Sequence, residues 1–409
     1  MATRTVAAAG EGADAVPRER SSVLPFTWVS VALGGLLVGG VFLDGWAHHH
    51  GRLDISLLGA TNLSQAYAPP GLPATISSWH VPYVVGIVLS GVLLGAVLVA
   101  NRTRGIPWAR TLPAPYWMSV WGVLMIVLGA VGEVIWPVSF RIGAPDTYRL
   151  ELGSSGLGAV LSPLRLIELV GLILIVTGPL RAAWLGAEEG PRRRFAPLPA
   201  VFSLAFLLSL LAYATQFAHP LVEPWPALSY WRRSLHTYRY GTFLFGESLG
   251  VMSILLQTAL MMAIILPAVR RWRLRPGGLT LLFTLNAALM AILQDYYAFA
   301  LVGLAAGIAA ELLLQRLPQS PRPREFQLFA FLVPAVYYLI YFVALTRMAN
   351  ISPSWGTLTR VVLPHPLEGI AWNVQLWTGT ALAAGLVGWA VSLLMLPAGP
   401  ARSPSARSG

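Results

Sequence analysis

The residues best suited to bind a metal lie close together near the start of the chain. Four of the seven histidines and two of the five aspartates fall between positions 44 and 80. Asp44 and His48 are four residues apart, a spacing that places two side chains on the same face of a helix. His80 opens the next apolar run, so it can approach that face from an antiparallel neighbour.

Two imidazoles and one carboxylate are typical ligands of copper, zinc or iron, and they leave coordination positions open for water or substrate. The chain has no cysteine, which excludes thiolate sites and iron–sulfur clusters. We therefore predict a metal site formed by Asp44, His48 and His80. Three neighbouring side chains are candidates for additional ligands or for partners that orient a ligand histidine, namely His49, His50 and Asp54. The alternative is that Asp44 caps a helix end and the histidines belong to a solvated loop.

The composition places these residues in a membrane protein. Hydrophobic residues make up 56% of the 409 positions and charged residues only 11%, against about 25% charged residues in a soluble globular domain. Apolar runs long enough to cross a bilayer recur along the chain. We predict an all-α, polytopic integral membrane helical bundle with about ten transmembrane helices, at 24–43, 80–100, 116–137, 157–179, 198–218, 246–267, 277–294, 297–315, 326–346 and 373–396.

The arginines predict the orientation of this bundle. All 28 basic residues are arginine, and the net charge is +11. With a cytoplasmic N-terminus, 19 arginines fall in cytoplasmic segments and 8 in outer segments, as the positive-inside rule requires. Both termini are then cytoplasmic, and all seven histidines lie on the outer, periplasmic side. Topology thus accounts for the positive charge, so we expect the lipid bilayer and no nucleic acid as a partner.

The chain is expected to divide into two helical units. A disordered cytoplasmic tail at 1–22 precedes a four-helix, metal-binding unit at 23–180. A charged cytoplasmic linker at 181–197 leads to a six-helix membrane unit at 198–397, and a second disordered tail follows at 398–409.

Charged residues inside the predicted spans need their own explanation, because a charge in the bilayer is costly and marks either an ion pair or a functional pathway. Arg165 and Glu168 are about one helical turn apart, and Glu133 can face them from the preceding helix. We favour a structural ion pair that holds this hairpin, either Glu133 with Arg165 or Arg165 with Glu168. We favour a role for Asp295 as the cap of a tight outer turn over a metal or proton role. We interpret Glu311 as a side chain that reaches the cytoplasmic surface, with a proton path as the alternative.

The first 180 residues resemble the C subunit of the copper-dependent membrane monooxygenases, which are the particulate methane and ammonia monooxygenases. The resemblance rests on Asp44-x3-His48, on Arg52-Leu53-Asp54, and on Ser78-x-His80 at the start of an apolar helix. It implies that Asp44, His48 and His80 bind copper.

Two departures from the family pattern are evident. His80 follows His48 by 32 positions, a longer separation than in the family, so this chain carries an insert at about 55–76. The family has a second polar cluster one hairpin later, whereas the matching positions here are Glu133, Pro137 and Arg165. The resemblance therefore implies that this second metal site is absent.

Three classes of function follow from these observations. The first is a bacterial inner-membrane protein with an outward-facing copper site, similar to a monooxygenase C subunit, that works in an oxidoreductase with other monooxygenase-type subunits or an electron donor; zinc and iron are the alternative metals. The second is a membrane transporter or metal-handling protein whose outer His/Asp cluster captures its cargo. The third is a structural or assembly protein with an incidental histidine loop.

Overall fold

The described part of the chain is entirely helical. The computed structural model describes residues 23–49, 78–140, 161–186, 196–227, 240–318, 321–348 and 370–395. Within these ranges there is no β-strand, and one isolated bridge pairs Ala227 with Ile370. The helices are α1 (Val23–His49), α2 (Val81–Thr103), α3 (Trp117–Phe140), α6 (Pro163–Val176), α7 (Gly178–Leu185), α8 (Leu198–Ala214), α10 (Tyr240–Arg271), α11 (Gly278–Ile292), α12 (Phe299–Gln315), α13 (Pro323–Met348) and α15 (Val374–Met395).

Every predicted span overlaps one of these helices or, in one case, the pair α6 and α7. Six helices are long and apolar enough to cross a membrane, and a seventh span results if α6 and α7, which meet at 48°, cross as one. The helices α8, α11 and α12 are apolar but shorter. Length and composition therefore support a multi-pass membrane protein with six to seven spans, and ten spans stay a prediction.

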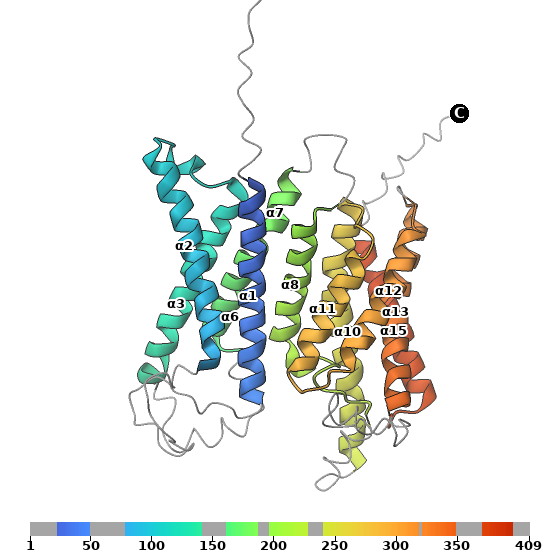
Figure 1. The fold of residues 1–409 in the computed structure, drawn as a ribbon. Helices are drawn as coiled ribbons and strands as arrows, with labels where there is room; N and C mark the ends of the chain where they lie inside the picture. Colours follow the sequence, from blue (N-terminus) through green and yellow to red (C-terminus); the bar gives the residue numbers. More distant parts are fainter. Residues whose placement is uncertain are drawn as a thin grey trace, which may run out of the picture.

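The helices form two neighbouring groups (Figure 1). The first helix group contains α1 to α7, and the second contains α8 to α15. Within them, closely packed partners are α1 with α2, α3 with α6, α11 with α12, and α13 with α15. Helix α1 also packs against α8 and α11, so it lies at the boundary between the two groups.

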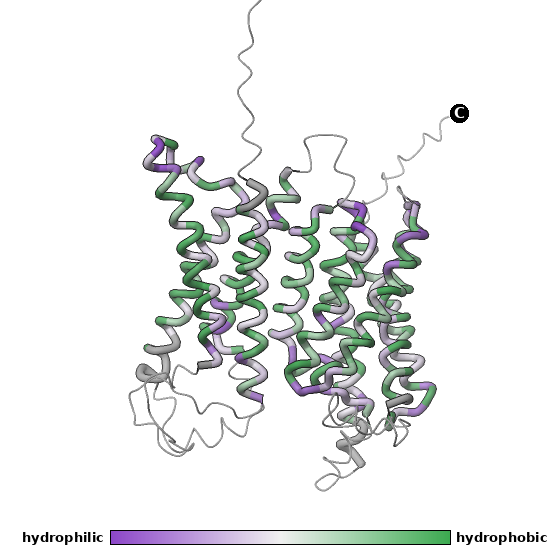
Figure 2. Tube along the Cα trace, viewed as in Figure 1, coloured by the Kyte–Doolittle hydropathy of each residue, from purple (hydrophilic) through white to green (hydrophobic). Residues whose placement is uncertain are grey.

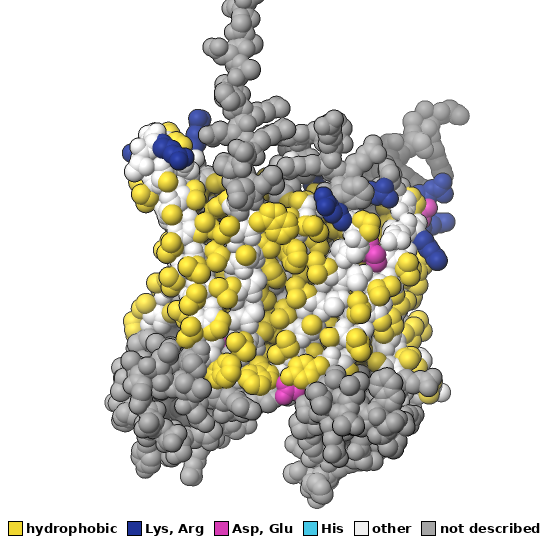
Figure 3. All heavy atoms as spheres, viewed as in Figure 1, with side chains coloured by type: hydrophobic (Ala, Val, Ile, Leu, Met, Phe, Trp, Pro, Cys, Tyr) yellow, Lys and Arg dark blue, Asp and Glu magenta, His cyan; other side chains and the backbone are white. Residues whose placement is uncertain are grey.

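The surface of the bundle is that of a membrane protein. Apolar residues fill the middle of the helices and polar residues lie near their ends (Figure 2). The visible face carries a broad apolar band, with arginine side chains gathered at one end (Figure 3). Large apolar side chains on the outer helices are exposed, for example Val92 of α2 and Trp121 of α3. Burying such a band in lipid removes it from water, which explains its stability in a bilayer.

The bend between α6 and α7 has a local cause. Pro179 has no backbone N–H, and its ring cannot pack against the carbonyl group four residues earlier. The guanidinium group of Arg181 donates hydrogen bonds to the carbonyl oxygens of Leu174 (2.9 Å) and Pro115 (2.9 Å). It also donates to the hydroxyl groups of Thr177 and Ser119. Arg181 thus satisfies polar groups at the bend and ties it to the start of α3.

Candidate metal centre

The candidate site begins with an unusually close approach of α1 to α2. A Cβ atom at Gly40 would lie 2.5 Å from the backbone nitrogen of Tyr83, and one at Gly86 would lie 2.9 Å from a methyl carbon of Leu37. Only glycine permits backbones to approach this closely. Because Asp44 lies one turn beyond Gly40 on the same face, it is directed at the start of α2.

Asp44 and His80 meet at this point. The Oδ1 atom of Asp44 is 3.5 Å from Nδ1 of His80, and both atoms are shielded from solvent. Asp44 is buried in the last two turns of α1, whereas His80 lies in the short 3₁₀ turn (Ser78–His80) that precedes α2. The structure therefore brings together two of the three predicted ligands from antiparallel helices.

The separation of these two atoms fits joint coordination of one ion. Nitrogen and oxygen ligands lie about 2.1 Å from zinc or a similar first-row ion. Two ligand atoms 3.5 Å apart would then subtend about 110° at the ion, close to the tetrahedral angle. The distance between the two atoms therefore matches the spacing of two ligands on one such ion.

The other predicted ligands are only partly described. His48 belongs to the last turn of α1, but its side chain lies outside the described residues, as do His50 and Asp54. Among the described residues there is no group of three or more His, Asp or Glu side chains that could hold a metal. The helical position of His48, four residues after Asp44, places it on the Asp44 face. Its participation remains a prediction.

His49 has a different role from the one its position in the sequence suggests. Its Nε2 atom is 2.9 Å from the side-chain oxygen of Gln216, and its Nδ1 atom is 3.2 Å from the side-chain nitrogen of Gln294. Each ring nitrogen is thus within hydrogen-bonding distance of one glutamine side chain. With both nitrogen atoms engaged by the second helix group, His49 joins that group to α1 instead of facing Asp44.

A second link lies one turn away. The indole N–H of Trp46 donates to Oδ1 of Asp295 (2.9 Å), and the hydroxyl group of Tyr297 donates to the same oxygen (2.6 Å). The Trp46 ring packs edge-to-face on Trp79, which directly precedes His80. Asp295 has φ 58°, the left-handed conformation that Asp and Asn tolerate better than most residues. The predicted turn residue thus also binds α1.

The charged residues of the fourth predicted span lie near the same end of the bundle. Glu168 is buried, and a Cβ at Gly129 of α3 would lie 2.4 Å from its Cγ atom, so α3 passes directly over it. Tyr213 of α8 is hydrogen-bonded to Gln216 and lies within electrostatic range of both Asp44 and Arg165. The side chain of Glu133 lies outside the described residues, so its predicted ion pair with Arg165 stays a prediction.

Sequence reasoning missed Gln216, Gln294 and Tyr213, because these residues are 160 or more positions away from α1 along the chain. The only signal in the sequence was the presence of polar side chains at the ends of apolar spans.

His219, expected in an outer loop, is buried just after the short turn that follows α8. Burial lowers its pKa to about 3, and its Nδ1 atom accepts a hydrogen bond from the backbone N–H of Leu221 (3.2 Å). It is therefore neutral.

Comparisons with protein-family models, with curated proteins and with solved structures gave no match. The resemblance to the monooxygenase C subunits rests on the sequence motifs alone.

Proposed function

We propose that this protein is a multi-pass protein of the bacterial inner membrane that binds one copper ion through Asp44, His48 and His80. The observation that carries the proposal is the 3.5 Å approach of Asp44 to His80 from antiparallel helices, at a place where both ligand atoms are buried. A carboxylate and an imidazole held together in this way are a partial metal site.

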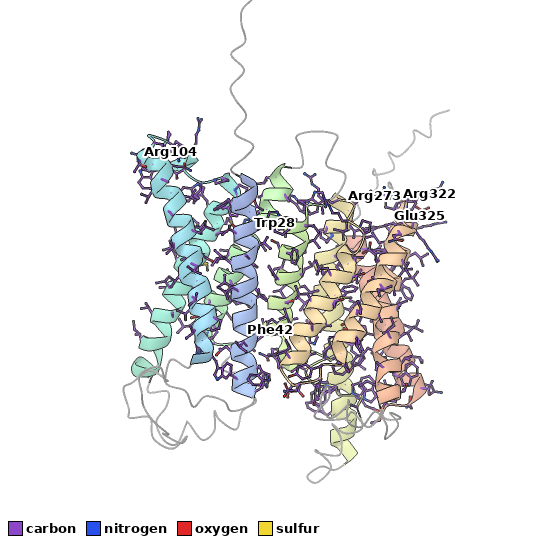
Figure 4. The ribbon with its side chains drawn as sticks, in the orientation of Figure 1. Trp28, Phe42, Arg104, Arg273, Arg322 and Glu325 are labelled. Atoms are coloured by element: carbon purple, nitrogen blue, oxygen red, sulfur yellow. The ribbon has the colours of Figure 1, made fainter. Side chains whose placement is uncertain are left out.

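The proposed orientation places this site on the periplasmic side, with ten spans and both termini in the cytoplasm. The helix ends support it. Asp44 lies at the end of α1 and His80 at the start of α2, whereas the described arginines other than Arg165 and Arg347 are found near the opposite helix ends. Arg104, Arg273 and Arg322 gather at that opposite end (Figure 4). Clusters of arginine are characteristic of cytoplasmic loops.

The proposed site combines the redox chemistry of the metal with the ligands and the apolar surroundings that the chain provides. Copper, when bound, would supply a redox-active ion with positions open to oxygen or substrate. The chain supplies the carboxylate of Asp44 and the imidazoles of His48 and His80 as ligands. The apolar helices α1 and α2, and the ring pair Trp46 and Trp79, keep water away from the ligand atoms. Electrons would come from a partner subunit or another donor.

Metal analysis of the purified protein tests this proposal. We expect the wild type to bind about one copper ion per chain, and Asp44→Ala, His48→Ala and His80→Ala each to weaken binding at least about 10–100-fold, the loss known even for groups that only orient ligands. Glu325→Ala is the matched control, because Glu325 is a partly exposed carboxylate at the start of α13, far along the chain from the candidate site, where it accepts a hydrogen bond from the backbone N–H of Arg322. Wild-type protein that binds no transition metal would reject the proposal.

The same preparation separates an oxidase from the alternative, a transporter or metal-handling protein. In proteoliposomes supplied with a chemical electron donor, copper-dependent oxygen consumption at the expense of that donor supports the oxidative function. Copper accumulation inside the vesicles, lost in Asp44→Ala, would instead assign the outer site to metal capture for transport.

A further inference from the structure

The last two turns of α1 present two different faces. Successive residues are about 100° apart around a helix, so Asp44 and His48 are about 40° apart, whereas Asp44 and His49 are about 140° apart. Gly40 and Asp44 face α2 and His80. The residues that face the second helix group are Phe42, Gly45, Trp46 and His49.

The second face is closely packed against α8 and α11. A Cβ at Gly45 would lie 2.7 Å from a ring carbon of Tyr213, 2.8 Å from its hydroxyl oxygen and 3.1 Å from Leu293. The ring of Phe42 packs edge-to-face on Tyr213, with 5.1 Å between the ring centroids. Figure 4 labels Phe42 in the half of α1 that carries Asp44, and Trp28 in the opposite half. The contact therefore lies directly behind the candidate metal site.

Hydrogen bonds fix this end of α1 further. Gln216 and Gln294 hold the two nitrogen atoms of His49, and Asp295 accepts the indole proton of Trp46. All three partners belong to the second helix group, and none of them lies on the face of α1 that Asp44 occupies. Their effect on the metal must therefore act through the position of α1.

We infer that the second helix group is a positioning device for the metal site, with Asp295 as its central positioning residue. It holds the last turn of α1 through Trp46 and so sets where Asp44 and His48 stand relative to His80. This inference rests on the proposed copper site. It assigns a function to the turn between α11 and α12, whose left-handed residue holds the carboxylate toward α1.

Two substitutions at Asp295 distinguish the contribution of its carboxylate from that of its left-handed backbone conformation. Asp295→Gly accepts φ 58° readily and removes the carboxylate, whereas Asp295→Asn accepts the same φ and keeps an oxygen that can receive the Trp46 proton. We expect Asp295→Gly to lower copper affinity about 10-fold and to change the copper EPR spectrum, with Asp295→Asn within about twofold of wild type. If the residue merely stabilises the turn, Asp295→Gly is expected to leave the copper affinity and the EPR spectrum unchanged.

Trp46→Phe is the second test, because it removes the N–H donor and leaves an aromatic ring beside Trp79. Its matched control is Trp28→Phe, since Trp28 also joins α1 to α8, through Phe202 with 6.3 Å between ring centroids, but at the other end of α1. We expect Trp46→Phe to weaken copper binding about 10-fold and Trp28→Phe to leave it unchanged. Wild-type affinity in both Asp295→Gly and Trp46→Phe would overturn the inference.

Hydrogen exchange in the metal-free protein tests the positioning role of Asp295 independently of copper binding. Loss of the Asp295 carboxylate is expected to speed amide exchange at residues 44–49, because local opening of that turn becomes easier. If the wild type binds no copper, the proposed function fails while the exchange result still decides whether Asp295 holds α1. Unchanged exchange in Asp295→Gly would reject the positioning role on its own.

Discussion

Gly40 tests whether the approach of α1 to α2 sets the geometry of the metal site. Gly40→Ala adds a Cβ that would lie 2.5 Å from the backbone nitrogen and 2.8 Å from the Cα atom of Tyr83. Nonbonded carbon contacts are ordinarily about 3.5 Å or longer, so the helices must separate by about 1 Å. The obstacle is backbone, which cannot rotate aside as a flexible side chain can.

A displacement of this size is large for a metal site. Asp44 Oδ1 and His80 Nδ1 are 3.5 Å apart. Two atoms can both lie about 2.1 Å from one ion only while they are within about 4.2 Å of each other. An added separation of about 1 Å exceeds that limit, so one of the two ligands is lost. We therefore expect copper affinity to fall by about 100-fold or more.

The neighbouring glycine provides the control. A Cβ at Gly39 would have no heavy atom within 4 Å, so Gly39→Ala should leave copper binding unchanged and can add up to about 1 kcal/mol of helix stability. Gly40→Ala should lower the free energy of unfolding by about 1–3 kcal/mol through overpacking. Competition with a copper chelator measures the affinity, and circular dichroism verifies that each variant is helical. A helical Gly40→Ala protein with wild-type affinity would refute the link between helix approach and metal binding.

Two predictions concern stability away from the site. Because burial holds the pKa of His219 at about 3, below about 6.5 in the unfolded chain, the unfolded state takes up the proton first as the pH falls. The free energy of unfolding should be unaffected above about pH 6.5 and should fall by about 2 kcal/mol as the pH is lowered to 5. Unfolding in detergent, followed at both pH values, measures this loss, which should be absent in His219→Gln. Glu311, contrary to the prediction that it reaches the cytoplasmic surface, accepts a hydrogen bond from the N–H of Leu279 (3.1 Å) and others from neighbouring N–H groups at the start of α11. Glu311→Ala should therefore lower the free energy of unfolding by about 3 kcal/mol, whereas Glu325→Ala at an exposed helix start should change it by less than about 1 kcal/mol.

Local patterns in the sequence predicted the helices well, because a long apolar run in lipid has few alternatives to a helix. Helix α1 shows the limit of this reasoning, since hydropathy ended the first span at 43 but the helix continues to His49. The polar residues of that last turn are held by Gln216, Gln294 and Asp295. Such support depends on packing between distant segments, and the hydropathy of one segment carries no information about it.

For the candidate site, too, local spacing predicted one part, and packing between distant segments determines the other. The spacing of Asp44 and the placement of His80 at a helix start predicted their approach, because both follow from helix periodicity and an antiparallel connection. The role of His49 could not be predicted in this way. Helix periodicity places it on a different face of α1 from Asp44 and His48, but its partners come from the packing of distant segments against α1.

Helix α1 therefore has two closely packed faces at one end, and two glycines explain how. Gly40 lets α2 approach one face, and Gly45, about 140° around the helix, lets Tyr213 approach the other. The last turn of a helix has unsatisfied carbonyl groups and frays readily when nothing holds it. Ligands on a fraying turn would bind a metal weakly, since their positions must be fixed within a few tenths of an ångström. Partners from a second helix group at this turn would therefore lower the cost of ordering the ligands of the proposed site.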